Sequence, residues 1–187
     1  MNKKVLISTI LVLTFAGCGS GGDTSSSGDR KSPTPKNQKQ YNLWSYMTPE
    51  SDHTNTYSIY SDNKTVKYNT QYSVKQNRVV EVNDYASNER TIYEKLSNKI
   101  KVRFEKNKKA NGMYELHLTA NEGDVITERS STCKLIKHYD NFEIKGKAFQ
   151  DVIEIKCGDI PGYYQKGVGE IAQAEEKNKK NIRVLSN

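Results

Sequence analysis

Apolar residues are scarce in this chain of 187 residues, in which hydrophobic residues make up 34% and the mean hydropathy is −0.84. Only residues 5–17 form an extended apolar run, which excludes a membrane protein with several spanning helices and leaves little material for a large core. The sequence has one Trp but 12 Tyr, all after residue 40. This distribution favours a folded domain over residues 41–187.

Residue patterns that carry catalysis or metal binding are also missing. The three histidines, His53, His117 and His138, show no metal-ligand spacing, and there is neither a Gly-x-Ser-x-Gly motif nor a phosphate-binding glycine loop. Carboxylates such as Asp151 and Asp159 would support hydrolysis only if two of them met in a cleft, about 5–10 Å apart. The sequence therefore predicts no catalytic residue, no metal site and no cofactor.

The N-terminus has the pattern of an export signal, with two lysines before the apolar run at residues 5–17. That run is too short to cross a bilayer as a helix, which takes about 20 residues. It ends in Leu13-Thr14-Phe15-Ala16-Gly17-Cys18. This stretch resembles the lipobox of bacterial lipoproteins, with Phe15 where that family prefers Leu. The resemblance implies that residues 1–17 are a signal peptide and that Cys18 carries diacylglycerol. The alternative is an ordinary secretory signal with a chance cysteine.

Acylation of Cys18 would hold the protein on a lipid bilayer of the cell envelope through two or more chains. By the sorting rule of Gram-negative members of the family, Gly19 in place of Asp points to the outer membrane, with the domain facing the periplasm. Removal of residues 1–17 takes two lysines and no acid from a net charge of +7, which leaves +5. An envelope protein or an anionic envelope polymer is therefore an expected partner, whereas an exported protein rarely meets nucleic acid.

Residues 18–40 comprise Cys18 and a segment without hydrophobic residues. Gly, Ser, Thr, Pro, Lys and Gln dominate residues 19–40, a composition that cannot bury apolar surface. We therefore expect a flexible linker between the lipid anchor and the domain at residues 41–187.

Alternation of apolar and polar residues predicts that the domain is built from β-strands. In residues 66–75, Val, Tyr and Thr occupy the even positions and polar residues the odd ones, as in a half-buried strand. Residues 96–105 repeat the pattern, with Leu96, Ile100, Val102 and Phe104 on the inward face. Further strands are predicted at residues 43–47, 56–60, 79–82, 89–93, 114–118, 125–128, 132–138, 142–145, 149–157 and 182–185.

Turn signals separate these strands, among them Asn111-Gly112 and Pro161-Gly162. The remaining helix candidate, residues 170–180, has no apolar stripe, so we interpret it as a strand end followed by a charged turn. Short strands at close spacing predict an all-β fold: an antiparallel meander, curled into a barrel or half-barrel or folded as a sandwich. Periodicity does not choose between these shapes.

The two remaining cysteines, Cys133 and Cys157, form a disulfide by default in an oxidising compartment. Cys157 shares the inward face of its predicted strand with Ile153 and Ile155, and Cys133 is expected to lie with Leu135. Two alternatives remain open. One is a pair of buried thiols on strands that are out of register, and the other is a catalytic thiol, for which the sequence offers no base close by.

Tyrosines recur within the predicted strands, and two roles fit them. Exposed rings would form a platform for a sugar or a peptide, whereas inward rings would fill a core that is poor in aliphatic residues, with the hydroxyls reaching its rim. We favour the core role for most of Tyr57, Tyr60, Tyr68, Tyr72, Tyr93 and Tyr114. The best candidates for a partly exposed patch and a binding edge are Tyr41, Trp44 and Tyr46.

The C-terminal part of the chain carries a second resemblance. Residues 146–155 read Gly-Lys-Ala-Phe-Gln-Asp-Val-Ile-Glu-Ile, and residues 163–171 read Tyr-Tyr-Gln-Lys-Gly-Val-Gly-Glu-Ile. Both stretches are similar to the C-terminal hairpin of uncharacterised exported bacterial β-sheet lipoproteins, which implies fold and location but no activity. Gly167 and Gly169, on alternate positions of one expected strand, would let an aromatic ring lie across it or would allow a bulge.

The expected location and the missing chemistry together favour a non-enzymatic, membrane-anchored β domain that binds a ligand or has a structural role in the envelope. The alternative is a periplasmic carrier or chaperone for an apolar ligand, which requires a hollow apolar cavity. An envelope hydrolase is the third hypothesis, and it requires His, Asp or Glu side chains that converge in a pocket.

Overall fold

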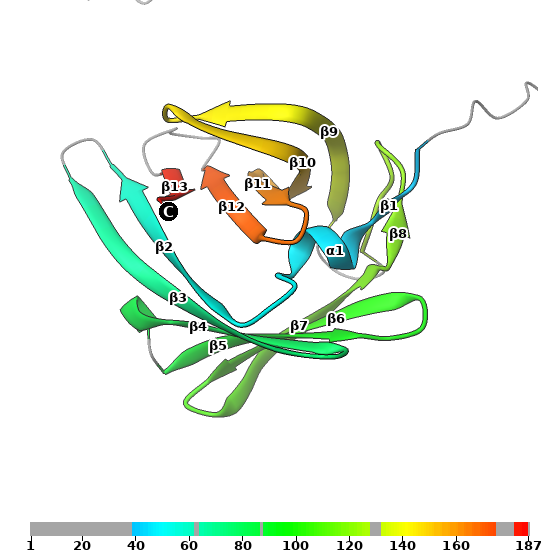
Figure 1. Cartoon of the computed structure of the whole chain (residues 1–187). Helices are drawn as coiled ribbons and strands as arrows, with labels where there is room; N and C mark the ends of the chain where they lie inside the picture. Colours follow the sequence, from blue (N-terminus) through cyan, green and yellow to red (C-terminus); the bar gives the residue numbers. More distant parts are fainter. Residues whose placement is uncertain (1–38, 62–63, 87, 128–131, 175–181, 187) are drawn as a thin grey trace, which may run out of the picture. The chain divides into compact units, whose positions relative to one another are not determined.

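The computed structural model describes residues 39–61, 64–86, 88–127, 132–174 and 182–186 (Figure 1). The predicted signal peptide at residues 1–17, Cys18 and the linker up to residue 38 lie outside these ranges, as does the charged turn predicted after residue 174. Within the described ranges, no helix has the length and apolarity that crossing a membrane requires.

The described chain is almost entirely antiparallel β-structure, as predicted. Its strands are β1 (Tyr41–Asn42), β2 (His53–Tyr60), β3 (Thr65–Lys75), β4 (Arg78–Asn83), β5 (Glu89–Lys95), β6 (Lys99–Lys106), β7 (Lys109–His117), β8 (Thr119–Ala120), β9 (Cys133–Ile144), β10 (Lys147–Cys157), β11 (Ile160–Gln165), β12 (Gly169–Ala174) and β13 (Ile182–Leu185). One eleven-stranded sheet has the order β7-β6-β5-β4-β3-β2-β13-β12-β11-β10-β9, and β1 and β8 form a separate pair. A short helix, α1 (Leu43–Met47), and a 3₁₀ turn, η1 (Asp84–Ala86), complete these elements.

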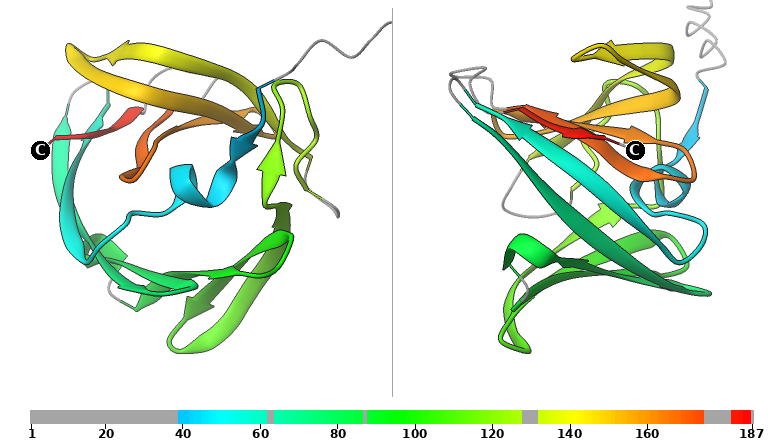
Figure 2. Two further views of the ribbon diagram at one scale, coloured as in Figure 1. Left: turned by 45° about the vertical axis from the view of Figure 1, so that its right-hand side comes forward. Right: turned by 60° about the vertical axis from the view of Figure 1, so that its left-hand side comes forward.

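Two meanders make up the large sheet, β2 to β7 and β9 to β12, and β13 joins them by pairing with β2 on one side and β12 on the other. The sheet curls strongly without closing into a barrel (Figures 1 and 2). Isolated bridges from Leu116 to Thr127 and from Val125 to Lys134 lie between its two ends. Among the predicted shapes, this curvature corresponds to the half-barrel.

The alternation predicted for β3 is confirmed in its centre, where Tyr68, Thr70 and Tyr72 are buried and the polar residues between them are exposed. Ile100 and Val102 of β6 are buried as well. The residues predicted to face inward that are instead exposed are Val66, Leu96 and Phe104. Each lies near or beyond the end of its strand, where neighbouring strands cover the face less.

Helix α1 occupies residues 43–47, where the sequence predicted a strand, so that prediction is wrong. The side chain of Asn42 caps the helix by accepting a hydrogen bond from the backbone N–H of Trp44, 3.1 Å away. Its buried side chains are Leu43, Tyr46 and Met47. Positions three and four apart share one helical face, so these side chains reach the core together, among residues of β6, β7, β9 and β10.

The exposed aromatic patch predicted at the start of the domain is wrong for two of its three members. Tyr41 and Tyr46 are only 6% and 4% exposed, whereas Trp44 is partly exposed. Tyr41 is held by the pairing of β1 with β8, and its ring stacks on His138 with 5.1 Å between the ring centroids.

Two predicted turns lie inside strands. The hairpin between β6 and β7 turns at Asn107 and Lys108, both with positive φ, while Gly112 lies in β7 with a φ of 134° beside a shift in the ladder. Pro161 pairs with Lys156 of β10, and the pairing of β11 with β12 begins only at the next residue. Pro161 therefore needs no N–H for a second ladder.

The predicted disulfide is confirmed. Cys133 and Cys157 are bonded, and they are directly opposite each other in the register of β9 and β10, with 4.1 Å between their Cα atoms. Both sulfurs are engaged in this bond, so neither the free-thiol nor the catalytic-thiol alternative holds. Cys133 is buried, but Cys157 is exposed rather than inward-facing, because it is the last residue of its strand.

The C-terminal glycines have a different role from the predicted one. Gly167 lies in the turn after β11, with a φ of 76°, and not on a strand. Its N–H donates to the carbonyl of Ser45, and its carbonyl accepts from the N–H of Glu50. Gly167 therefore binds the backbone on either side of α1 and does not pack against an aromatic ring. An aromatic ring does lie across Gly162, where a Cβ atom would be 2.9 Å from Tyr164. The interpretation of residues 170–174 as strand is confirmed.

Candidate functional site

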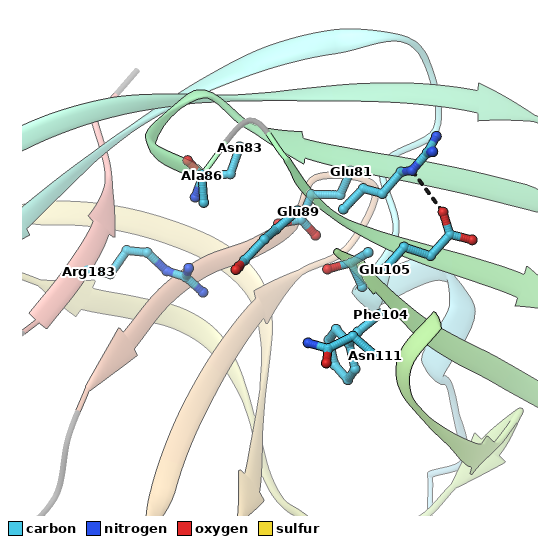
Figure 3. Close-up of a pocket in the computed structure, with 10 residues that line it drawn as sticks. Glu81, Asn83, Ala86, Glu89, Phe104, Glu105, Asn111 and Arg183 are labelled. Carbon is cyan, nitrogen blue, oxygen red and sulfur yellow. Dashed lines mark ion pairs between the residues drawn. The ribbon is translucent and has the colours of Figure 1, made fainter. Parts of the chain in front are cut away.

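A polar pocket of about 370 Å³ lies where β4 to β7 face β13 across the curve of the sheet (Figure 3). We call it the interior pocket. Its lining residues are Glu81, Asn83, Ala86, Glu89, Arg90, Thr91, Phe104, Glu105, Asn111 and Arg183. In the sheet order, β4 and β13 are separated by β3 and β2, so Glu81 and Arg183 reach one space because the sheet curls.

Arg183 is the cation at the inner side of the pocket. Its Nη1 atom donates a 3.1 Å hydrogen bond to the hydroxyl of Tyr68, its Nη2 atom is paired with the carboxylate of Glu170, and its guanidinium lies 5.6 Å from the ring centroid of Tyr57. Burial is the largest single effect and lowers the pKa of Arg183, but the charges of Glu170, Tyr68 and Glu81 and the hydrogen bond to Glu170 together outweigh it and raise the pKa above its ordinary value. The guanidinium therefore stays charged.

Glu81 is the carboxylate that faces this cation. It accepts a 3.1 Å hydrogen bond from the hydroxyl of Tyr93. Burial, and after it the negative charge of Glu170, raises the pKa of Glu81 to about 7, against the opposing effect of Arg183. Among the described residues, no Lys or Arg nitrogen lies within ion-pair distance of Glu81, so this carboxylate is half-protonated near neutral pH without a cation partner.

Tyrosine hydroxyls form the wall behind these charges. The hydroxyl of Tyr57 donates to the backbone carbonyl of Glu170 at 2.6 Å and lies 3.1 Å from the hydroxyl of Tyr72. The core role predicted for the tyrosines is confirmed for Tyr57, Tyr68 and Tyr72, which are buried. Burial raises the pKa of Tyr57 and Tyr72 above the ordinary value, so these hydroxyls remain neutral hydrogen-bonding groups.

The other two carboxylates of the pocket are each paired with a cation. Nε of Arg90 lies 2.9 Å and Nε of Arg103 lies 3.4 Å from Glu105, and Nζ of Lys106 lies 2.7 Å from Glu89. The pair of Lys106 and Glu89 is well exposed, which is typical of a rim that solvent screens. Neighbouring cations therefore neutralise the carboxylates at the rim of the pocket. Glu81, deeper in the pocket, has no such partner among the described residues.

A second cluster of titratable groups joins α1 to β9 and β10. Oδ1 of Asp151 accepts a 2.6 Å hydrogen bond from the Tyr46 hydroxyl and lies 2.8 Å from Nε2 of His138. Burial raises the pKa of Asp151, but the hydrogen bonds from Tyr46 and His138 outweigh it and leave that pKa below its ordinary value. Asp151 has a φ of 51°, a costly conformation for a residue other than glycine.

Among the described residues, this second cluster has no hydroxyl or thiol within hydrogen-bond distance of His138. Within the described ranges, the side chains within hydrogen-bond or ion-pair distance of its ring nitrogens are the carboxylates of Asp151 and Asp140. Nucleophilic catalysis requires a hydroxyl or thiol at that distance. The cluster therefore supports a structural tie between the helix and the sheet.

The three histidines lie on separate strands: His53 on β2, His117 on β7 and His138 on β9. His53 stacks on Tyr72, with 5.0 Å between the ring centroids. Within the described part of the chain, no group of three or more His, Cys, Asp or Glu side chains is arranged to hold a metal ion.

Sequence reasoning missed the charged residues of the interior pocket. Glu81 interrupts the apolar run Val79-Val80-Glu81-Val82, and Arg183 interrupts Ile182-Arg183-Val184-Leu185. A single charge inside an apolar strand is a usable signal, because such a charge is costly unless it has a partner or a function. Of the residues that the sequence did select, Cys18 lies outside the described ranges, and Cys133 and Cys157 form the disulfide.

The C-terminal resemblance falls on adjacent strands of the sheet. Residues 146–155 lie mostly in β10, and residues 163–171 span the end of β11, a turn and the start of β12. No protein-family model, no curated protein and no solved structure was found to match this chain, so the function has to be inferred from the site itself.

Proposed function

We propose that this protein is a lipid-anchored binding protein of the bacterial cell envelope, whose β domain holds a small polar ligand in the interior pocket without transforming it. One observation carries the proposal: Glu81 and Arg183, from strands that are not neighbours, project into one pocket of about 370 Å³. Ligand pockets of this size with a few convergent polar groups are typical of small-molecule sites.

The chemistry of the pocket supports binding rather than catalysis. Arg183 is held by Glu170 and Tyr68, and the raised pKa values of Tyr57 and Tyr72 keep their hydroxyls protonated, so that they are poor nucleophiles. The lining also favours a polar ligand over the apolar cargo of a carrier, because seven of its ten residues are Glu, Asn or Arg.

The anchor part of the proposal rests on the lipobox resemblance at residues 13–18. Two or more acyl chains on Cys18 give effectively stable attachment, because each buried methylene contributes about 0.8 kcal/mol. Gly19 then favours the outer membrane, with the β domain in the periplasm.

The binding function is tested by blocking the pocket. Ligand-observed NMR with the full-length protein and mixtures of small polar metabolites should detect bound molecules. Thr91→Trp, which adds a large ring to the lining, should abolish that binding. Ser73→Trp places the same ring on an exposed position of β3 and should leave binding intact. Binding that survives in Thr91→Trp, or no bound molecule in any mixture, would contradict the proposal.

A further inference from the structure

The charge inventory of the interior pocket is unequal. At the rim, Glu89 is paired with Lys106, and Glu105 is paired with Arg90 and also with Arg103, which Glu105 shares with Glu94. Deeper in, the single guanidinium of Arg183 faces two carboxylates, Glu170 and Glu81, and it is paired with Glu170. Whenever Glu81 is ionised, its charge therefore has no Lys or Arg nitrogen of the described residues within ion-pair distance.

Next to Glu81, the side chains on one face of β4, β5 and β6 change from charged to polar to aromatic. Glu81 on β4 is the register partner of Thr91 on β5, and Thr91 is the partner of Phe104 on β6. Directly opposed side chains of one face point the same way, so a carboxylate, a hydroxyl and a ring succeed one another over about 10 Å, twice the strand spacing. Phe104 is 38% exposed, so its ring is accessible from the pocket.

We infer that the interior pocket takes a small organic cation, whose primary ammonium group pairs with Glu81 and whose apolar body lies against Phe104. The inference deepens the proposed binding function and rests on it. An ammonium group pairs with the ionised carboxylate, and its N–H donors suit the hydroxyl of Thr91 and the side-chain carbonyl of Asn111, which also line the interior pocket. A carboxylate ligand would instead meet Glu81 with like charge.

The ionisation of Glu81 makes the inference testable by pH. The titratable groups that interact with it are Tyr57 on β2, Tyr68 and Tyr72 on β3, Tyr93 on β5, Tyr114 on β7, Tyr164 on β11, Glu170 on β12 and Arg183 on β13. With a pKa of about 7, Glu81 is mostly protonated at pH 6 and mostly ionised at pH 8. Affinity for an ammonium ligand should therefore rise about tenfold between these pH values, because only the ionised carboxylate pairs with it.

The experiment is calorimetric titration of the full-length protein in detergent with three matched probes: 2-phenylethylamine, neutral 2-phenylethanol and anionic phenylacetate. The amine should bind at least tenfold more tightly than either other probe at pH 8, and its affinity should fall at pH 6. Glu81→Gln should weaken amine binding at least tenfold and remove the pH dependence. Glu94→Gln makes the same change on the opposite face of β5, at a residue near Arg78 and Arg103, and should bind like the wild type.

The outcomes separate this inference from the proposed function. Equal or tighter binding of the alcohol or of phenylacetate, blocked by Thr91→Trp, overturns the cation inference and leaves the binding function standing. Absence of binding by all three probes overturns the inference, and it overturns the binding function too only if the metabolite mixtures also yield no ligand. The pH profile of the wild type requires no variant, so a folding defect in Glu81→Gln does not remove the test.

Discussion

The hydroxyl of Tyr46 donates a 2.6 Å hydrogen bond to Oδ1 of Asp151, which lies 105 residues further along the chain. The bond ties α1, the first helix after the expected linker, to the centre of β10. The same carboxylate contacts His138 of β9, and its backbone holds a positive φ. A strained residue persists where several contacts fix it, so these bonds position the helix as well as stabilise it.

Removal of the Tyr46 hydroxyl should destabilise the domain. Tyr46→Phe leaves the ring in place and deletes a hydrogen bond to a charged group, which costs about 1–2 kcal/mol of the free energy of unfolding. Urea denaturation followed by circular dichroism measures this loss. Tyr60→Phe is the matched control, because its ring lies near the amine of Lys145, and it should change stability by less than about 0.5 kcal/mol. Equal free energies of unfolding for the Tyr46 and Tyr60 variants would show that the bond between Tyr46 and Asp151 does not stabilise the domain.

Glu81 should make the domain less stable as the pH rises. Its pKa is about 7 in the folded protein and 4.5 in the ordinary state, so between these values the folded state binds more protons than the unfolded state. Stability therefore falls from about pH 4.5 to pH 7 and levels off above, by up to about 3 kcal/mol. Glu81→Gln cannot titrate, so the stability difference between variant and wild type should grow from pH 5 to pH 8. A difference that is constant with pH in denaturation curves would refute this account.

Asp151 should have the opposite pH effect. Its pKa is lower in the folded state than in the ordinary state, so it stabilises the fold at neutral pH, and this contribution is lost as the pH falls through the acidic range below about 4. Asp151→Asn should therefore lower the melting temperature at pH 7 and have a smaller effect at pH 3. Thermal melts at the two pH values provide the measurement, and an equal loss at both would argue against an ionic contribution.

The disulfide should contribute substantially to stability. Cys133 and Cys157 are 24 residues apart, and closing a loop of that size stabilises by about 3 kcal/mol in the chain-entropy model. The double variant Cys133→Ser/Cys157→Ser should unfold at a correspondingly lower urea concentration. Mass spectrometry of the wild type with and without reductant checks that the bond is present. If reduction left the wild-type urea midpoint unchanged, the bond would have no stabilising role.

The lipid anchor should depend on one sulfur atom. Cys18→Ser in the full chain should abolish incorporation of labelled palmitate and release the protein from the membrane fraction. The Cys133→Ser/Cys157→Ser variant removes two other sulfurs and should still be labelled. Membrane association and labelling that persist in Cys18→Ser would exclude the lipoprotein assignment.

Period-two alternation predicted most strands because one face of the sheet is buried, as Tyr68, Thr70 and Tyr72 demonstrate. It failed for residues 43–47, where a short stretch with four apolar or aromatic residues and Ser45 fits a strand as well as a helix, and the capping side chain of Asn42 favours the helix. The interior pocket lay beyond reach for a different reason. Glu81 and Arg183 line the same pocket because of the strand order and curvature of the sheet, and the local sequence pattern predicts neither of these.

The position of β13 has a consequence for how the sheet is assembled. The other strands that the structure describes precede β13 in the chain, yet β13 lies between β2 and β12 in the sheet. Without β13, β2 and β12 would each present an open row of N–H and C=O groups, which is a template for wrong pairing with other chains. Arg183 is on β13, so the interior pocket is complete only once this late strand has paired with β2 and β12.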